Sequence, residues 1–270
     1  MRTDGERRTA LVTGASSGIG RELARIFAAE GFDVVVVARR RAALEELATE
    51  LRSSYGARVV ALDCDLTEDG APKRLYGALR RRRIDVDVLV NNAGVAVFDD
   101  FTDNTLDGLL DLIRLNVVAL TALTRLFVEP MVARGSGRIL NVASVAAFQP
   151  TPWLAAYGAS KAYVLSLSES LAVELAGTGV TVTALCPGFT DTPLVESAER
   201  ELNRSKMIPR LLMLDPTAVA RQGFEACMAG RTICINGRPY QLAVYWERMQ
   251  PRWLVRAIGG AIGSYFQRGT

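Results

Sequence analysis

The chain contains no histidine, and its four cysteines show no Cys-x-x-Cys spacing. A zinc site would therefore have to be built from thiolates and carboxylates alone. We interpret the cysteines as reduced thiols of a cytosolic protein, because structural disulfides are rare in that compartment. They are Cys64, Cys186, Cys227 and Cys234. The sequence thus predicts no metal site.

The sequence also lacks long apolar runs and a strong charge of one sign. No run approaches the ~20 apolar residues that a membrane-spanning helix needs, and no apolar signal region precedes the first predicted strand. The formal net charge is only +3, and no stripe of aromatic and basic residues suggests base stacking, which argues against nucleic acid as a partner. We therefore expect a cytoplasmic protein that is soluble or at most peripheral to a membrane.

Short β-branched segments alternate with longer amphipathic ones, the pattern of βαβ units around a parallel sheet. The strands are nearly continuous in apolar residues, as expected where helices cover both faces. We predict a doubly wound α/β fold with a seven-stranded parallel sheet, in a single domain over residues 1–270. The predicted strands are Thr9–Thr13, Asp33–Ala38, Arg58–Leu62, Val86–Val90, Arg138–Ala143, Val180–Cys186 and Thr232–Ile235.

Two segments depart from this alternation. Pro193–Asp215 mixes charged and apolar residues, and we expect a mobile helical flap there. Residues 240–270 are expected to form a helical extension of the same domain. The extension carries no acidic residue after Glu247 but four arginines, so contact with an anionic membrane is one interpretation. Packing on the core or on a partner subunit is the favoured alternative, because glycines weaken the amphipathic pattern of the last helix. That pattern consists of Leu254, Ile258, Ala261, Ile262 and Tyr265.

A glycine-rich turn, Thr13-Gly14-Ala15-Ser16-Ser17-Gly18-Ile19-Gly20, follows the first predicted strand. Such a turn before a helix lets backbone N–H groups face a pyrophosphate. Gly14 would permit the tight turn, Gly18 would leave room for phosphate, and Gly20 would let helix and strand pack closely. The spacing differs from the common Gly-x-Gly-x-x-Gly fingerprint. Its place at the first strand–helix junction nevertheless predicts a dinucleotide site.

The end of the second predicted strand indicates which dinucleotide binds. A carboxylate there would bind the ribose 2′-hydroxyl, whereas arginine accommodates a 2′-phosphate. The strand runs into Arg39, Arg40 and Arg41 with no acidic residue at that end. Since guanidinium groups match phosphate geometry, we predict NADP(H) rather than NAD(H). Arg39 is the expected reader of the phosphate, and Arg40 is second.

Two further segments follow predicted strands on the cofactor side. Asp65-Leu66 follows the third strand, where Asp65 would accept from the adenine amine or, alternatively, form an Asx turn. Asn91-Asn92-Ala93-Gly94 ends the fourth strand. Its small residues would let the backbone contact the nucleotide.

Tyr157 and Lys161 are i, i+4 neighbours on a helix predicted to begin near Trp153. A free tyrosine has a pKa near ~10, too high for proton transfer at neutral pH. An ammonium about 4 Å away, in a medium of effective dielectric ~20, would stabilise the phenolate by about 4 kcal/mol. That stabilisation is sufficient to bring the pKa of Tyr157 near neutrality.

Two polar residues accompany this pair. Ser144 follows the fifth strand, at the carboxyl edge where such sheets bind ligands. Its hydroxyl could donate to a substrate carbonyl oxygen. Asn116 lies within the long helical pattern Leu106–Val128, where an amide is not a strong helix former. It either holds a water that links the lysine to solvent or is a satisfied buried amide.

In this order, the motifs resemble those of the short-chain dehydrogenase/reductase family from about Thr9 to Thr192. The resemblance implies a Rossmann-like fold, homodimers or homotetramers, and Tyr157 as general acid/base. It also implies that Lys161 binds the nicotinamide ribose, that Ser144 positions substrate and that Asn116 supports a proton relay. The matching motifs are Thr13–Gly20, Asp65-Leu66, Asn91–Gly94, Asn116, Ser144, Tyr157-x-x-x-Lys161 and Pro187-Gly188-x-Thr190-x-Thr192.

The same resemblance adds cofactor contacts from Thr190 and Thr192 to the nicotinamide carboxamide, and from the backbone of Ile19. Many relatives that prefer NADP carry a basic residue inside the glycine turn, where this chain has Ser16 and Ser17. The NADP(H) prediction therefore depends on the arginines after the second strand.

The segments expected to line the substrate pocket are largely apolar, so we expect an apolar carbonyl or alcohol as substrate. The predicted function is NADP(H)-dependent hydride transfer. One alternative is a non-catalytic, cofactor-sensing protein on the same fold, which could dispense with Tyr157 or Lys161. A sugar-nucleotide epimerase or dehydratase is disfavoured by the glycine spacing. The pocket segments are Val95–Phe101, Val145–Trp153 and Phe189–Leu202, with Val97, Phe98, Phe148, Trp153 and Leu194 as the apolar side chains.

Overall fold

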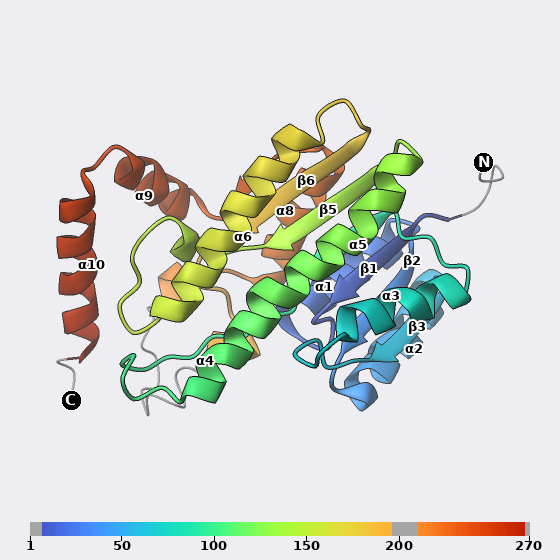
Figure 1. Cartoon of the computed structure of the whole chain (residues 1–270), viewed down its shortest axis with the longest axis horizontal. Helices are drawn as coiled ribbons and strands as arrows, with labels where there is room; N and C mark the ends of the chain where they lie inside the picture. The colour runs from blue at the N-terminus through green and yellow to red at the C-terminus, as the bar shows by residue number, and fades with distance from the viewer. Residues whose placement is uncertain (1–6, 196–209, 268–270) are drawn as a thin grey trace.

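The computed structural model describes residues 7–195 and 210–267. Its centre is a seven-stranded sheet in the order β3-β2-β1-β4-β5-β6-β7, and every strand pair is parallel (Figure 1). The predicted fold class is confirmed, and each predicted strand is present with ends within two residues. The strands are β1 Thr9–Thr13, β2 Asp33–Ala38, β3 Val59–Asp63, β4 Val88–Asn91, β5 Gly137–Val142, β6 Val180–Cys186 and β7 Ile233–Ile235.

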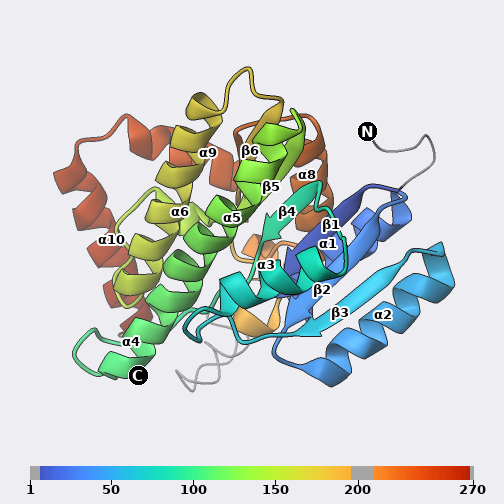
Figure 2. The ribbon, with the colours of Figure 1, turned by 45° about the vertical axis from the view of Figure 1, so that its right-hand side comes forward.

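Helices cover both faces of the sheet (Figures 1 and 2). α1, α2 and α8 pack on one face, and α3, α5 and α6 pack on the other. Because the chain order reverses between β1 and β4, the carboxyl ends of these strands border the crevice in which such folds bind ligands. The helices are α1 Gly18–Ala29, α2 Arg41–Tyr55, α3 Ala71–Arg81, α4 Leu106–Ile113, α5 Leu120–Ala133, α6 Ala155–Glu174, α8 Pro216–Met228, α9 Arg238–Arg248 and α10 Arg252–Gln267.

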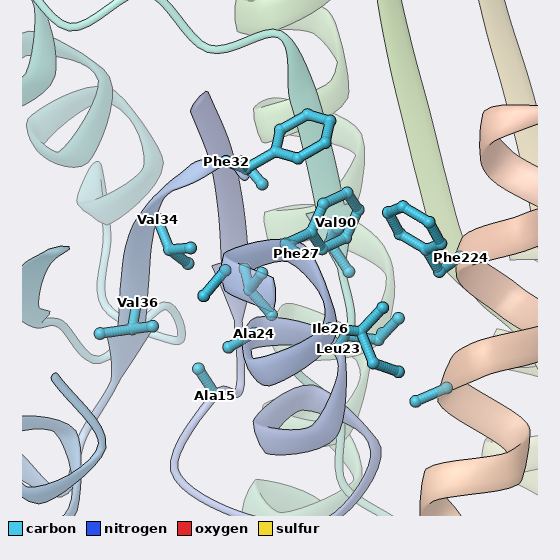
Figure 3. Packing of buried hydrophobic residues seen from close by; sticks show 14 of the residues in the cluster. Ala15, Leu23, Ala24, Ile26, Phe27, Phe32, Val34, Val36, Val90 and Phe224 are labelled. Atoms are coloured by element: carbon cyan, nitrogen blue, oxygen red, sulfur yellow. The ribbon is translucent and has the colours of Figure 1, made fainter. Parts of the chain in front are cut away.

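The core behind the glycine turn is closed by three aromatic rings. Phe27 of α1 meets Phe32 and Phe224 edge-to-face, with ring centroids 5.2 and 5.0 Å apart (Figure 3). Leu23 and Ala24 lie on the same face of α1 and are fully buried. This helical spacing of apolar residues joins α1 to both the sheet and α8. The packing fixes the start of α1 relative to the ends of the central strands.

Three local features bear on the sequence-based expectations. The pattern Leu106–Val128 is helical throughout, as predicted, but a π-helical stretch, Arg114–Ala119, lies between α4 and α5. α6 begins at Ala155, after Trp153 adopts a positive φ of 63°. Most of the expected flap, residues 196–209, lies outside the described residues, and Arg210–Leu212 forms a short 3₁₀ turn.

Candidate functional site

The glycine-rich turn joins β1 to α1. Gly14 and Gly18 have φ angles of 66° and 53°, in the left-handed region that glycine adopts without strain. A Cβ at Gly20 would lie 2.3 Å from Asn92 Nδ2 and 2.5 Å from the carbonyl oxygen of Gly14. Among the described residues, no side chain caps the N-terminus of α1, which follows Ser17. The turn therefore fits a pyrophosphate, because it combines uncapped backbone donors with close backbone approach.

The end of β4 is held against this turn by a small hydrogen-bond network. The Thr13 hydroxyl accepts from the backbone N–H groups of Asn92 and Ala93, both at 3.0 Å, and donates to the carbonyl of Val90 at 3.1 Å. Asn92 Nδ2 donates to the carbonyl of Thr13 at 2.9 Å. Asn92 thus braces the turn with its side chain, and Thr13 is a supporting residue to which the sequence analysis assigned no role.

Two arginines border the turn at the end of β2. Arg40 donates to the carbonyl oxygen of Ser16 at 3.1 Å and to its hydroxyl at 3.2 Å. Arg39 is 66% exposed, and its Nη1 lies 3.9 Å from Asp65 Oδ2. Both guanidinium groups therefore lie beside the predicted adenosine side of the crevice, with Arg40 tied to the turn and Arg39 reaching into solvent.

Asp65 forms an Asx turn, the second of the two roles expected for it. Its Oδ1 accepts from the backbone N–H of Thr67 at 2.9 Å and from the Thr67 hydroxyl at 2.7 Å. Burial raises the pKa of Asp65, but the Thr67 hydrogen bonds and Arg39 together hold it below its ordinary value. The neighbouring Leu66 is buried in the hydrophobic core, so only its backbone is placed to contact a ligand.

Gly94 joins the cofactor side to the catalytic side. A Cβ at this position would lie 3.2 Å from Asn116 Oδ1 and 3.4 Å from Lys161 Nζ. Asn116 itself lies in the π-helical stretch, and its side chain is buried. Its Oδ1 accepts from the N–H of Val95 at 3.0 Å, while its Nδ2 donates to the carbonyl of Val95 at 2.9 Å and to Ser160 Oγ at 3.1 Å. Asn116 is thus a satisfied buried amide, and it fixes the backbone of Val95 after the end of β4.

Ser160 is a second supporting residue to which the sequence analysis assigned no role. Its hydroxyl donates to the carbonyl oxygen of Tyr157 at 2.7 Å and accepts from Asn116. It therefore links the π-helical stretch to the turn of α6 between Tyr157 and Lys161. Its position three residues after Tyr157 could have indicated this role. However, serines in many surface helices also bond to their own backbone, so the spacing alone does not identify a supporting residue.

Lys161 is buried, with 5% of its surface exposed. Its Nζ donates to the carbonyl oxygen of Val142, the last residue of β5, at 2.8 Å. The same atom lies 5.6 Å from the ring centroid of Tyr157. Desolvation lowers the pKa of Lys161 to about 8, with a small opposing effect of Cys186. The amine therefore remains mainly protonated at neutral pH.

Ser144 and Tyr157 complete the group at the carboxyl edge of β5. The Ser144 oxygen accepts from the N–H of Ala146 at 3.1 Å, which leaves its O–H to donate. Burial raises the pKa of Tyr157, and its hydrogen bond with Ser144 acts in the opposite direction. The expected lowering of this pKa by Lys161 is therefore not found. The physical reason is that phenolate desolvation dominates, while the ammonium is directed at Val142.

The loop after β6 spans both sides of the crevice. Pro187 accepts from the N–H of Val145 at 3.0 Å, and the Thr192 side chain lies over the turn, 3.1 Å from the position of a Cβ at Gly18. Thr190 is buried, and its hydroxyl donates to the carbonyl of Gly188 at 3.0 Å. Thr192 is thus close to the glycine turn, and the hydroxyls of both threonines donate within the loop, that of Thr192 to the carbonyl of Thr190 at 3.2 Å.

The ring of Tyr240 covers this loop from α9. A Cβ at Gly188 would lie 2.2 Å from the Tyr240 ring, whose hydroxyl accepts from the N–H of Phe189 at 3.3 Å and donates to the carbonyl of Leu212 at 2.8 Å. No local sequence signal indicated this contact.

The apolar side chains predicted for the pocket are half-buried, and residues 196–202 of its third segment lie outside the described residues. These side chains are Val97, Phe98, Phe148, Trp153 and Leu194.

Comparisons with known proteins identify the family of this chain. A family model described as short chain dehydrogenase matches residues 8–203. A short chain dehydrogenase of Pseudocercospora fijiensis is 35% identical over 248 residues, which cover 87% of this chain and 80% of that protein. The chain therefore belongs to the short-chain dehydrogenase/reductase family. It is an NAD(P)-dependent oxidoreductase with a Rossmann-like nucleotide-binding fold.

Solved structures show the same fold. A short-chain dehydrogenase from Sphingobium yanoikuyae in complex with NADPH has a TM-score of 0.80 and 33% identity, covering 97% of this chain and 96% of that chain. A bulky-bulky ketone specific alcohol dehydrogenase from Comamonas testosteroni has a TM-score of 0.75 and 29% identity, covering 89% and 92%. A relative from Burkholderia phymatum in complex with NAD has a TM-score of 0.78 and 29% identity, covering 90% and 94%. In the part of the chain described here, no helix is long and apolar enough to cross a membrane.

Proposed function

We propose that the protein is an NADP(H)-dependent carbonyl reductase or alcohol dehydrogenase in which Tyr157 moves the proton. The observation that carries this proposal is the meeting of Ser144, Tyr157 and Lys161 at the carboxyl edge of β5, beside Gly94 at the end of β4. A cofactor-sensing protein would not need a buried lysine at this place, since burying an amine is costly.

The residues act together on the carbonyl oxygen of the substrate. When bound, the nicotinamide supplies the hydride for reduction or accepts it for oxidation. In the reductive direction, Tyr157 Oη donates its proton to the carbonyl oxygen, while the Ser144 hydroxyl donates a hydrogen bond to the same atom. The Lys161 ammonium lies 5.6 Å from the centre of the Tyr157 ring, and its further donors suit the ribose hydroxyls. Asn116 and Ser160 hold α6 in register for this step.

The cofactor preference rests on the arginines after β2. Arg39 is exposed beside the crevice and Arg40 borders Ser16, so both suit a 2′-phosphate. The complex of the Sphingobium yanoikuyae relative with NADPH supports this assignment. The Burkholderia phymatum relative, which binds NAD, shows that the fold alone does not decide the preference. We therefore assign NADP(H) on these local charges.

We further propose an apolar substrate and a cytoplasmic homodimer or homotetramer. The half-buried side chains of Phe98 and Trp153 support an apolar carbonyl or alcohol, whereas Phe148 packs on the cluster around Val244 with Arg248 over its ring. The Comamonas testosteroni relative, specific for bulky ketones, supports the same class. Sedimentation of the full chain would establish the number of subunits, and a screen of bulky ketones with NADPH and NADH in parallel would establish the substrate class.

The Tyr157→Phe variant tests the proposed function. It removes the proton donor but keeps the ring, so turnover should fall about 1,000-fold while NADPH still binds, as measured by its fluorescence. Tyr163→Phe is the matched control on the same helix, because its hydroxyl faces Thr121 at 3.0 Å instead of the site. Unchanged turnover in Tyr157→Phe, or an equal loss in Tyr163→Phe, would overturn the assignment.

A further inference from the structure

One face of α9 presents an apolar stripe to solvent. Leu242, Tyr245, Trp246 and Met249 occupy positions i, i+3, i+4 and i+7, and all four are exposed. Leu242 is 71% exposed and Met249 is 75% exposed. Trp253, at the start of α10, continues the exposed apolar surface. A soluble monomer rarely gathers large exposed apolar side chains in this way, so the stripe marks an interaction surface.

The opposite face of α9 packs on the protein. Tyr240 and Val244 belong to the hydrophobic cluster below the loop after β5. The acid of α9, Glu247, also turns inward: its Oε1 is buried without a hydrogen-bond partner among the described residues, and burial raises its pKa to about 7. The helix is therefore docked by one face, and its carboxylate is directed away from the apolar stripe.

Positive charge borders the stripe at both ends. Arg238 is exposed at the start of α9 on the stripe side, and Arg252 and Arg256 are exposed on the first half of α10. From Arg248 to Thr270 the sequence contains four arginines and no acidic residue. In both views α10 stands at the end of the molecule, apart from the sheet (Figures 1 and 2). The surface combines tryptophan, tyrosine and aliphatic side chains with flanking cations.

We propose that α9 and the start of α10 form a docking surface for an anionic lipid bilayer. The aromatic and aliphatic side chains suit the boundary between headgroups and acyl chains, and the arginines match acidic headgroups. Charge complementarity selects this partner over a second copy of the chain, since a symmetric copy would bring its arginines against these. The protein thus docks peripherally, through one helix face and its flanking arginines.

The docking surface lies next to the substrate side of the site. Tyr240, on the inner face of α9, contacts Gly188 and the loop that leads to Thr192. In α10, a Cβ at Gly259 would lie 3.4 Å from the carbonyl oxygen of Pro150, in the segment just before α6. A bilayer held by α9 would therefore be close to the segments that lead to Tyr157, which suits delivery of apolar molecules from the lipid phase.

Vesicle flotation of the full chain tests this inference. The probes are vesicles of phosphatidylcholine alone and vesicles that contain phosphatidylcholine and phosphatidylserine in equal parts. We expect binding to the phosphatidylserine vesicles, loss of binding at high salt, and a blue shift of tryptophan emission on binding. Equal binding to both vesicle types, or binding to neither, would contradict the proposal.

Substitutions separate the apolar and the charged contributions. Leu242→Ser and Met249→Ser should each weaken vesicle binding roughly tenfold, and Arg252→Gln and Arg256→Gln should each weaken it roughly fivefold. Val173→Ser is the matched control, because Val173 is 77% exposed on α6. All variants should keep the melting temperature and the turnover of a water-soluble carbonyl compound, since none of these residues touches the site.

Sedimentation tests whether the stripe binds a second copy of the chain instead of a bilayer. If Leu242→Ser and Met249→Ser convert an oligomer into a smaller species and leave vesicle binding unchanged, α9 is a subunit interface and the lipid proposal is wrong. The result does not depend on the proposed reaction, because both measurements are made without substrate.

Discussion

The cofactor side and the substrate side of this site are built in different ways. On the cofactor side, backbone lies against backbone: Gly20 fits only because its Cβ is missing, and Asn92 bonds to the carbonyl of Thr13. On the substrate side, side chains from distant segments meet, as when the Tyr240 ring covers Gly188. Backbone packing demands particular residues at particular spacings, whereas side-chain packing admits many solutions. The glycine turn is therefore recognisable from sequence, whereas the contact of Tyr240 with Gly188 is not.

The pair Gly20→Ala and Gly188→Ala tests this comparison most strongly. The new methyl at Gly20 would lie 2.5 Å from the carbonyl oxygen of Gly14, and backbone at this place cannot move away. We therefore expect the variant to lose about 3 kcal/mol of unfolding free energy and to bind NADPH more weakly. The methyl at Gly188 would meet a side chain, the Tyr240 ring, instead of backbone, so a smaller loss of about 1 kcal/mol is expected. Urea unfolding and NADPH titration measure both effects; equal losses would contradict the contrast between the two sides.

Lys161, where the two sides meet, should make stability depend on pH. Its pKa is lowered from 10.5 to about 8 in the folded protein, so the native state binds fewer protons than the unfolded chain between these values. The Lys161 contribution to stability should therefore rise with pH in this window, by about 3 kcal/mol in total, and the difference in unfolding free energy between wild type and Lys161→Met should show that rise.

The measurement is urea unfolding of wild type and variant from pH 7 to pH ~10.5. Cys186 acts in the opposite direction, because burial raises its pKa to about 12 and the unfolded chain loses that proton first as pH rises; the thiol is present in both proteins, so the Lys161 contribution is read from the difference between wild type and variant. The exposed lysine in α3, replaced in Lys73→Met, is the control and should keep the wild-type pH dependence. An identical pH dependence of stability in wild type and Lys161→Met would show that the amine is not desolvated.

Arg39→Gln sharpens the comparison on the cofactor side. Losing a charged hydrogen bond to phosphate is expected to cost about 2 kcal/mol, so the preference for NADPH over NADH should fall roughly thirtyfold. Arg58→Gln changes an arginine at the opposite end of the neighbouring strand β3 and serves as the control. An unchanged ratio of kcat/KM values for the two cofactors would remove Arg39 from the phosphate site.

The smallest expected effect concerns ion pairs on the two sides. Arg25 of α1 donates to Glu50 of α2 through Nε at 2.6 Å and through Nη2 at 3.0 Å. Arg248 and Glu169, by contrast, are 3.8 Å apart, and both of these side chains are exposed. Glu50→Gln should cost about 1 kcal/mol, and Glu169→Gln should cost nothing measurable.

The contribution of Glu50 should also depend on pH. The Arg25 hydrogen bonds lower the pKa of Glu50 below its ordinary 4.5, so its stabilisation is present above that value and is lost as pH falls through the lowered pKa. The difference in unfolding free energy between wild type and Glu50→Gln should therefore shrink in acid. A constant difference would mean that Arg25 acts by packing alone.

Sequence reasoning succeeded where short-range constraints act. The limits of β1 and β2 were predicted to the residue, and the i, i+4 spacing placed Tyr157 and Lys161 on one helix near β5. It did not predict the π-helical stretch around Asn116, whose side chain bonds to Val95 and Ser160, far away in sequence. It also failed on the direction of the Tyr157 pKa, because burial is a property of the whole fold.

The amino-acid sequence by itself determined the alternation of strands and helices, the glycine turn and the family, because periodicity and backbone freedom are properties of neighbouring residues. Only the tertiary structure decided that Asn116 clamps Val95, that Tyr240 covers Gly188, and that one face of α9 stays exposed while Glu247 turns inward. These outcomes depend on which surfaces meet and lose their water, and that is settled only when segments far apart in the chain pack together.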